Sequence, residues 1–431
     1  MERPWSARKL HFVGMSGAGM SGLAVVAHAL GATISGSDRA PWPAWAREAT
    51  GYEPTIGHAA ENVPAGATVV YSTAIRPDNP ERTTGAPELH RADLLGEITR
   101  LKPTIAVSGT HGKTTTSSMV VHALRGAGAD PSYLVGGEVR STGANAGWGT
   151  GEWLVVEADE SDRSLLKLRA DIAVVTNAEL DHHTTYASRR DVDETFRQFL
   201  ANAQHAIVPP ELSDLTEHPV TFDAQPQLTA SGSTFTFDGI TVTLTVPGAH
   251  NARNAAAALT AVKLAGADVN KAAAALADFQ GAGRRFETLG RTATGARVVD
   301  DYAHHPTEVA ATIAAARTQN PRRVVALFQP HLYSRTQREA RAFGAALAQA
   351  DLPVILDIYP AREDQADYPG VTGLLVAEAI ADAGNGKRVV WMPSHADAQA
   401  FLSRELREGD LLLTMGAGDV DKVGRALVEG V

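Results

Sequence analysis

The chain contains no cysteine, which excludes disulfides, thiolate metal sites, iron–sulfur clusters and cysteine nucleophiles. It also lacks an apolar run of the ~18 residues that a membrane-spanning helix needs. Charges such as Lys263 and Arg317 interrupt or end its alanine-rich stretches near residues 255–277 and 310–316. The apolar run Leu10–Val13 is too short to be the core of a secretory signal. We therefore expect a cytoplasmic protein with no membrane partner.

Positive charge is in deficit, with 39 lysines and arginines against 49 acidic residues and a formal net charge of −10. Such a balance argues against general binding to nucleic acid or to an anionic membrane surface. Any phosphate site must then be a local pocket. The 44% share of apolar residues is sufficient for ordinary globular cores, and 431 residues suggest about three domains of ~150 residues each.

Short apolar segments of strand length alternate with alanine- and leucine-rich segments of helical length, which is typical of parallel sheets covered by helices. A first helix is predicted to begin near Met20. The segment Arg100–Thr104 contains a proline and precedes a new strand, so we interpret it as a linker. Strands are predicted in the first two blocks at Leu10–Val13, Ala32–Ser35, Thr68–Tyr71, Ile105–Ser108, Trp153–Glu157 and Ile172–Thr176.

The pattern changes between residues 233 and 248, where apolar and polar residues alternate on both sides of Asp238–Gly239. This alternation around an Asp-Gly turn predicts an antiparallel hairpin. An alanine-rich helix is predicted from about Asn254 to Leu264. A third α/β block follows, with strands predicted at Arg297–Val299, Val324–Phe328, Val354–Ile358, Val389–Met392 and Leu411–Met415.

Together these patterns predict an α/β protein of three domains. The predicted boundaries are residues 1–102, 103–281 and 282–431. The central domain would carry the antiparallel hairpin as an appendage.

The strongest local motif is IAVSGTHGKTTTSS at residues 105–118, in which a buried strand leads through two glycines into a helix predicted to start at Thr114. Backbone N–H groups at such a helix start can bind phosphate oxygens, and the glycines allow a close approach. Lys113 is expected to contact the outer phosphates, and the Thr114 hydroxyl to bind Mg²⁺. The spacing is a compact variant of the usual phosphate loop, since Val107 stands where that pattern has its first glycine. We predict nucleotide binding here.

Polar clusters follow two further strands of the same block. EADES begins with Glu157, and NAELDHH contains Asn177, Asp181 and His182. In open parallel sheets ligands bind at the carboxyl ends of the strands, so these side chains are expected beside the phosphate loop. A carboxylate and a neutral imidazole can both bind divalent metals that hold ATP phosphates.

A second glycine-rich segment, HFVGMSGAGMSG, matches G-x-G-x-x-G at Gly17, Gly19 and Gly22, with Asp38 following on the next strand end. This pattern predicts a diphosphate at a helix start. It does not by itself distinguish a nicotinamide dinucleotide from a sugar nucleotide. The separate phosphate loop favours the sugar nucleotide.

These motifs, in this order, resemble the Mur ligase family over nearly the whole chain. VVYSTAIRPDNPE at 69–81 and GAHNARNAAAAL at 248–259 are similar to family segments. GAGRRFE, DDYAHHPTEV, FQPHLYSRT and the final GAGDV are most similar to the alanine-adding branch. The resemblance implies a Rossmann-like UDP-binding domain, a central ATPase-type domain with a phosphate loop, and a Rossmann-like third domain that binds the amino acid and closes over the nucleotide.

The resemblance also implies an activity in peptidoglycan precursor synthesis: ATP- and Mg²⁺-dependent joining of L-alanine to the lactyl carboxylate of UDP-N-acetylmuramate through an acyl phosphate. Such ligases are monomers or homodimers acting on small molecules. Catalytic roles are implied for Lys113, Glu157, His182 and Arg285, and metal binding for Thr114, Glu157 and His182. ATP contacts are implied at Gly109, Thr110, His111, Gly112, Lys113, Thr114, Thr115, Asn251, Asn254, Arg285 and Asp301. The UDP portion would contact Gly17, Ala18, Gly19, Met20, Ser37, Asp38 and Ser72, and the amino-acid end His304, His331 and Arg335.

The chain departs from the family pattern after His182, where His183, Thr184 and Thr185 replace a segment that usually carries an aspartate near the metals. No lysine occurs between Lys167 and Lys263, so the carbamylated lysine of several sister ligases has no counterpart here. The alanine-adding branch is similar in lacking it.

Three other readings stay open at this stage. The first is a ligase that attaches a recycled tripeptide to the same UDP-sugar. The second is a nicotinamide-dependent oxidoreductase with an ATP-regulated domain, which would transfer hydride at Gly17–Gly22. The third is a nucleotide sensor without catalytic activity.

Overall fold

The computed structural model describes residues 4–430, and these residues form two compact units. The first contains the chain up to Ala224 together with Thr236–Thr243 and Arg253–Ala282. The second contains Gln225–Phe235, Leu244–Ala252 and the chain from Gly283 onward. In the described part of the chain, no helix has both the length and the apolar character needed to cross a membrane.

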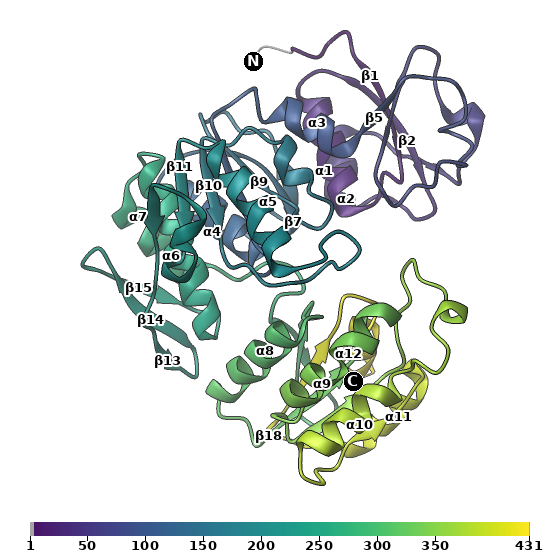
Figure 1. Ribbon diagram of the computed structural model, residues 1–431, viewed down its shortest axis with the longest axis vertical. Helices are drawn as coiled ribbons and strands as arrows, with labels where there is room; N and C mark the ends of the chain where they lie inside the picture. Colours follow the sequence, from purple (N-terminus) through teal and green to yellow (C-terminus); the bar gives the residue numbers. More distant parts are fainter. Residues whose placement is uncertain (1–3, 431) are drawn as a thin grey trace. The chain divides into compact units, whose positions relative to one another are not determined.

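The first unit begins with a five-stranded sheet in the order β3-β2-β1-β4-β5, and every pair in it is parallel. Helices α1, α2 and α3 lie beside it (Figure 1). Its central strand β1 is buried from Leu10 to Val13, as expected of a strand that is covered on both faces. The bounds are β1 Lys9–Val13, α1 Ala18–Ala29, β2 Thr33–Asp38, α2 Ala44–Thr50, β3 Thr55–Ile56, β4 Thr68–Tyr71, β5 Glu88–His90 and α3 Arg91–Ile98.

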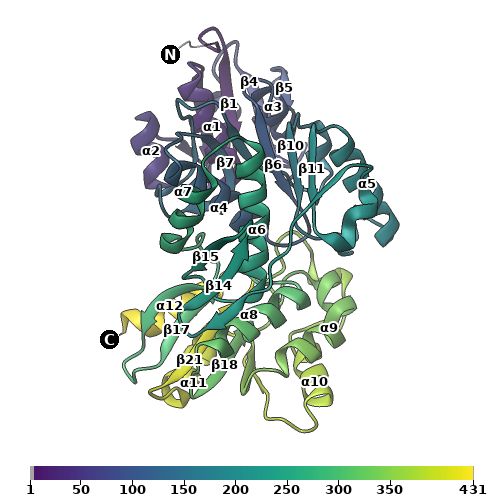
Figure 2. The same ribbon diagram turned by 90° about the vertical axis from the view of Figure 1, so that its left-hand side faces the viewer.

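The same unit contains a seven-stranded sheet in the order β12-β11-β10-β6-β9-β7-β8. All its pairs are parallel except β7–β8 at one edge, and β6, β10 and β11 run side by side in Figure 2. The bounds are β6 Thr104–Ser108, α4 Lys113–Gly126, β7 Ser132–Val139, β8 Ala144–Gly147, β9 Leu154–Glu157, β10 Ile172–Val175, α5 Arg189–Ala201, β11 His205–Val208 and β12 Pro219–Thr221. Helices α6 (Ala249–Leu264) and α7 (Val269–Ala275) follow later in the chain.

Local sequence sets the ends of these helices. Ser188 and Asp191 form a capping box at the start of α5, and the Asp268 carboxylate accepts the N–H groups of Asn270 and Lys271 at the start of α7. Asp238 (φ +49°) and Gly239 (φ +80°) both adopt the left-handed conformation that a tight hairpin turn requires. This turn joins β14 (Gly232–Phe237) to β15 (Ile240–Leu244) in a three-stranded sheet with β13 (Gln227–Thr229). The predicted antiparallel appendage therefore has a third strand.

The second unit contains a six-stranded sheet in the order β16-β17-β21-β18-β19-β20, parallel except for the edge pair β16–β17. Its central strands β17, β18 and β21 are buried between two apolar clusters, one on each face. The bounds are β16 Glu287–Arg291, β17 Arg297–Asp301, α8 Pro306–Thr318, β18 Arg323–Phe328, α9 Tyr333–Leu347, β19 Leu352–Ile355, α10 Leu374–Ala383, β20 Val390–Trp391, α11 His395–Glu405, β21 Asp410–Met415 and α12 Asp421–Glu429.

The α/β fold class predicted from the sequence is confirmed: three parallel-rich sheets occur, in the order expected. One predicted strand is shifted. The segment predicted as Val354–Ile358 forms a strand at Leu352–Ile355, and Asp357 instead accepts the N–H of Gly373. The proposed domain limits at residues 102 and 281 stay predictions.

Candidate active site

The phosphate loop connects β6 to α4, and two of its residues leave no room for a side chain. A Cβ on Gly109 (φ +130°) would lie 2.1 Å from the Thr176 hydroxyl, and one on Gly112 (φ +81°) would lie 2.7 Å from the Asn254 amide oxygen. Both conformations favour glycine. Binding of an anion by the backbone N–H groups at the start of α4 stays a prediction.

The loop is held from one side by the segment that follows β10. Asn177 accepts the His111 N–H through its side chain (2.9 Å) and the Thr110 N–H through its carbonyl (3.2 Å). The Thr110 hydroxyl accepts the N–H of Glu179 at 2.8 Å. These bonds link the predicted phosphate loop to the predicted NAELDHH cluster.

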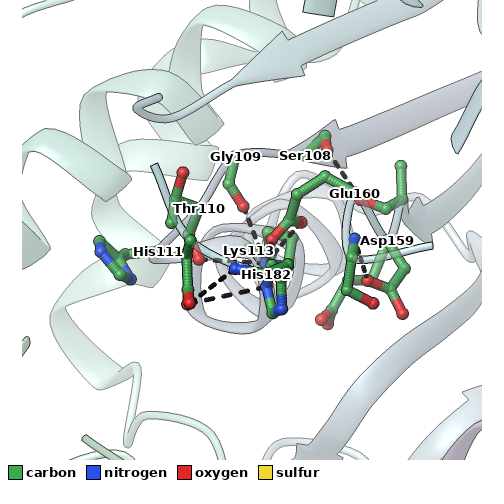
Figure 3. A network of polar contacts seen from close by, with 12 residues as sticks. Ser108, Gly109, Thr110, His111, Lys113, Asp159, Glu160 and His182 are labelled. Atoms are coloured by element: carbon green, nitrogen blue, oxygen red, sulfur yellow. Dashed lines mark hydrogen bonds and ion pairs between the residues drawn. The ribbon is translucent and has the colours of Figure 1, made fainter. Parts of the chain in front are cut away.

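Lys113, the first residue of α4, turns back toward the loop (Figure 3). Its ammonium donates to the carbonyls of Gly109 (2.8 Å) and Thr110 (3.2 Å) and lies 2.8 Å from the Glu160 carboxylate. Burial alone would lower the pKa of Lys113, but the nearby carboxylates, Glu160 first among them, raise it above its usual value. Lys113 is therefore a fixed positive charge beside the loop amides.

Glu160 is the acid in closest contact with this lysine, and the sequence motif alone did not single it out. Its carboxylate also lies 3.1 Å from Nε2 of His182, so it bridges Lys113 and His182 (Figure 3). The residue is buried, and its carbonyl accepts the Tyr186 hydroxyl at 2.6 Å. The signal that could have identified it is its place in EADES, three residues beyond the end of β9.

The three predicted metal ligands come from three segments, which follow β6, end β9 and follow β10. Thr114 is buried in the first turn of α4. Glu157 ends β9 and accepts the Gly136 N–H at 2.7 Å, while His182, in a left-handed conformation (φ +50°), contacts Glu160. Thr115, predicted to contact ATP, is buried in the same turn as Thr114.

A cavity of about 1040 Å³ adjoins the start of α1. Six of the seven residues predicted to contact UDP line it: Gly17, Ala18, Gly19, Met20, Asp38 and Ser72. The Asp38 carboxylate accepts the backbone N–H groups of Ser16 (2.8 Å) and Arg39 (2.6 Å), which fixes the turn below the glycine-rich segment. The seventh residue, Ser37, is buried outside this lining.

Next to the buried Ser37 lies Glu81, a fully buried acid that was not predicted as a site residue. It ends the NPE motif at the close of 69–81 and accepts hydrogen bonds from the Ser37 hydroxyl (2.6 Å), the Asn62 amide (2.7 Å) and the Ala59 N–H (3.2 Å). It also lies 3.5 Å from His58, which lines the cavity. Burial would raise the pKa of Glu81, but the contact with His11, followed by the hydrogen bonds from Ser37, Asn62 and Ala59, lowers it to about 2.

In the second unit, Asp301 ends β17 and accepts the N–H groups of Phe286 and Ala303, both at 2.8 Å. Burial raises the pKa of Asp301 to about 6, although the Arg285 charge opposes this effect. The Arg285 guanidinium lies 5.0 Å from the centre of the Tyr302 ring. The predicted pair Arg285 and Asp301 is therefore close together at one strand end.

The residues predicted for the amino-acid end are neighbours of this pair. His304 and His331 have ring centres 6.0 Å apart, and Arg335 lies 3.4 Å from Nδ1 of His331. Burial lowers the pKa of His304 to about 3, so its imidazole is neutral. Asn251 donates to the Pro247 carbonyl at 2.7 Å, and its predicted contact with the nucleotide stays a prediction.

Comparison with protein families finds matches along most of the chain. Residues 9–103 match the Mur ligase family catalytic domain, residues 107–262 the Mur ligase middle domain, and residues 284–418 the glutamate ligase domain of Mur ligases.

Curated relatives match the chain from end to end. It is 42% identical to the UDP-N-acetylmuramate–L-alanine ligase of Renibacterium salmoninarum, over 98% of this chain and 96% of that protein. It is 40% identical to the enzyme of the same name from Streptomyces griseus, over 100% and 97%.

Two solved structures have the same fold. The UDP-N-acetylmuramate–alanine ligase of Thermotoga maritima is similar with a TM-score of 0.82 and 27% identity, covering 98% of both chains. A murein peptide ligase from Psychrobacter arcticus gives a TM-score of 0.73 at 24% identity, again over 98% of both chains.

Proposed function

The chain belongs to the Mur ligase family, and on this premise we propose that it joins L-alanine to UDP-N-acetylmuramate at the expense of ATP. The observation that carries the proposal is the phosphate loop with Lys113 held beside it, in a chain about 40% identical to alanine-adding ligases over its full length. An ATP-dependent ligase needs a loop that binds the phosphates of ATP. The choice of L-alanine as the amino acid that is joined rests on the alanine-adding relatives.

The reaction proceeds in two steps. An oxygen of the lactyl carboxylate attacks the γ-phosphorus of ATP, the bond from that phosphorus to the β,γ-bridging oxygen breaks, and ADP leaves. The product is an acyl phosphate, whose carbonyl now carries a leaving group. The neutral amine of alanine then attacks this carbonyl, the acyl C–O bond breaks, phosphate leaves, and the nitrogen releases a proton to solvent.

The protein contributes placement and charge more than covalent chemistry. The loop amides and the Lys113 ammonium offset the negative charge that accumulates on the transferred phosphoryl group. Lys113 stays protonated at neutral pH, since its pKa is raised. The carboxylates around it require compensation when a triphosphate binds.

Divalent metal fits this charge pattern. We propose that Thr114, Glu157 and His182 hold Mg²⁺, because hydroxyl, carboxylate and imidazole are suitable ligands. Thr114 lies in the first turn of α4, Glu157 ends β9, and His182 follows β10 and contacts Glu160, the partner of Lys113. Bound Mg²⁺ would neutralise phosphate charge. Glu160 belongs to the same group of acids and is an additional candidate ligand.

The test is phosphate release in the presence of ATP, Mg²⁺ and UDP-N-acetylmuramate, with amino acids and the murein tripeptide offered one at a time. We expect release to depend on L-alanine. Preference for the tripeptide would show instead a ligase that attaches a recycled tripeptide to the same UDP-sugar. Hydride transfer to a nicotinamide would overturn the ligase assignment.

Lys113→Ala tests the loop itself. The variant should lose turnover, whereas Lys167→Ala, which removes a half-exposed lysine paired with Asp93, should keep it. Near-normal ligation by Lys113→Ala would contradict the mechanism.

A further inference from the structure

A second, smaller cavity of about 230 Å³ lies beside the large one in the first unit. The two cavities share Ala18, Gly19 and Arg91 in their linings, so they meet at the glycine-rich start of α1. The smaller cavity extends from there to Glu157 and Asp159, the acids at and just beyond the end of β9. It therefore connects the proposed diphosphate site with the neighbourhood of the phosphate loop.

Most of the smaller cavity is apolar or acidic. Leu23, Leu95 and Leu134 form its walls, and Glu157 and Asp159 are at its inner end. Among the described residues that line it, Arg91 alone carries a positive charge. An anionic group entering this space would meet two carboxylates, and Arg91 is the side chain that can compensate for them.

Arg91 is the first residue of α3, and its guanidinium reaches toward both ends of the passage. One amino group lies 3.1 Å from the Asp159 carboxylate and 3.3 Å from that of Asp162. The other lies 3.6 Å from the position that a Cβ on Gly19 would take. The fork of the guanidinium can thus keep its acidic partners on one side and present donors to a ligand on the other.

Asp159 connects this arginine with the phosphate loop. The next residue, Glu160, lies 2.8 Å from the Lys113 ammonium, and the Asp159 carboxylate itself lies 3.1 Å from the Arg91 guanidinium. It fixes Arg91 on the side of the passage that leads to Lys113.

We propose that Arg91 binds an anionic group of the donor substrate where it passes from the larger cavity into the smaller one. This inference rests on the proposed function, since the donor is the sugar nucleotide. Two groups of that molecule have the required chemistry, the diphosphate and the lactyl carboxylate. Both must lie between the glycine-rich helix start and Lys113 if the carboxylate is to reach the γ-phosphate.

The first experiment measures steady-state phosphate release by Arg91→Ala and Arg91→Lys. We expect the KM for UDP-N-acetylmuramate to rise by about tenfold or more in Arg91→Ala, because a charged hydrogen bond is lost, while the KM for ATP changes by less than about twofold. Arg91→Lys should be intermediate, since an ammonium cannot serve Asp159 and a ligand in the same planar geometry. The control is Arg47→Ala, a half-exposed arginine of α2 outside both linings, which should leave both KM values unchanged.

Calorimetry with UDP, UDP-N-acetylglucosamine and UDP-N-acetylmuramate identifies the group that is bound. Weaker binding of all three by Arg91→Ala assigns the contact to the diphosphate. Weaker binding of UDP-N-acetylmuramate alone assigns it to the carboxylate. Unchanged affinity for all three, with wild-type thermal stability, would overturn the inference. Failure of the proposed function would be distinguishable, because the wild-type protein would then release no phosphate with donor and alanine.

Discussion

Glu81 provides a test of what stabilises the larger cavity of the first unit, in which we propose that the sugar nucleotide binds. It is fully buried and accepts hydrogen bonds from two segments of the chain: the end of β2 through the Ser37 hydroxyl, and residues 59–62 through the Ala59 N–H and the Asn62 amide. All three partners donate. Glu81→Gln would keep the shape of the side chain, but its amide N–H₂ group is a donor and would face groups that themselves donate.

The magnitude follows from the pKa of Glu81, which lies at about 2 in the folded protein against 4.5 ordinarily. A lowered pKa stabilises the fold above the ordinary pKa, and the stabilisation disappears as the pH falls toward the folded value. This difference corresponds to about 3 kcal/mol at about pH 7 and about 2 kcal/mol at about pH 3.5. Glu81→Gln should lose stability by about these amounts.

The assay is urea unfolding of wild type and Glu81→Gln at both pH values, followed by circular dichroism. Glu61→Gln is the matched control, because Glu61 lies in the same loop region but is exposed. The gap between wild type and Glu81→Gln should narrow at the lower pH. A gap below about 1 kcal/mol at about pH 7, or one that does not depend on pH, would refute the reasoning. Because Glu81 contacts His58, we also expect a higher KM for the donor.

Three further predictions concern the other sites. Gly109→Ala should weaken ATP binding at least about tenfold in calorimetry, because its Cβ would collide with Thr176, whereas Gly128→Ala, also at positive φ but in open space, should not. The free energy of unfolding of Asp301→Asn, measured by thermal unfolding relative to wild type, should increase by about 1.4 kcal/mol between about pH 5 and pH 8. The reason is that the raised carboxyl pKa makes the wild type lose stability as the pH rises through about 6. A difference that does not change with pH would contradict this. Glu160→Gln should bind metal-free ATP about tenfold more tightly, since a carboxylate next to Lys113 is removed, and weaker binding would show that Glu160 supports the nucleotide instead.

Much of the fold could be predicted because the central strands are buried on both faces and appear as uninterrupted apolar runs. β4 at Thr68–Tyr71 has the predicted bounds, and β6 and β10 differ from prediction by one residue. The antiparallel edge strands β8 and β16 were not predicted. β8 reads ANAG and β16 reads ETLGR, and neither has the alternation or β-branched content that indicates a strand. They are strands because they pair with β7 and β17, which is a tertiary contact that their own sequences do not indicate.

In the site, too, residues with a local sequence signal could be predicted, whereas residues that depend on distant contacts could not. The phosphate loop could be placed from its glycines, which its conformation requires. Glu160, Glu81 and Arg91 were missed because each lies in a loop or at a helix start, where the sequence does not indicate which way a side chain points. Their importance depends on distant partners: Glu160 on His182, Glu81 on Ser37, and Arg91 on Asp159.

The contacts of Lys113 have a consequence for selectivity among anions. The ammonium is already engaged by two carbonyls and one carboxylate of its own chain. An incoming ligand must outcompete this internal counter-ion, so a lone orthophosphate gains little, whereas a metal-complexed triphosphate offers enough simultaneous contacts to displace it. Because Glu160 is held next to Lys113 by its own chain, we expect it to lower the affinity of the loop for small anions.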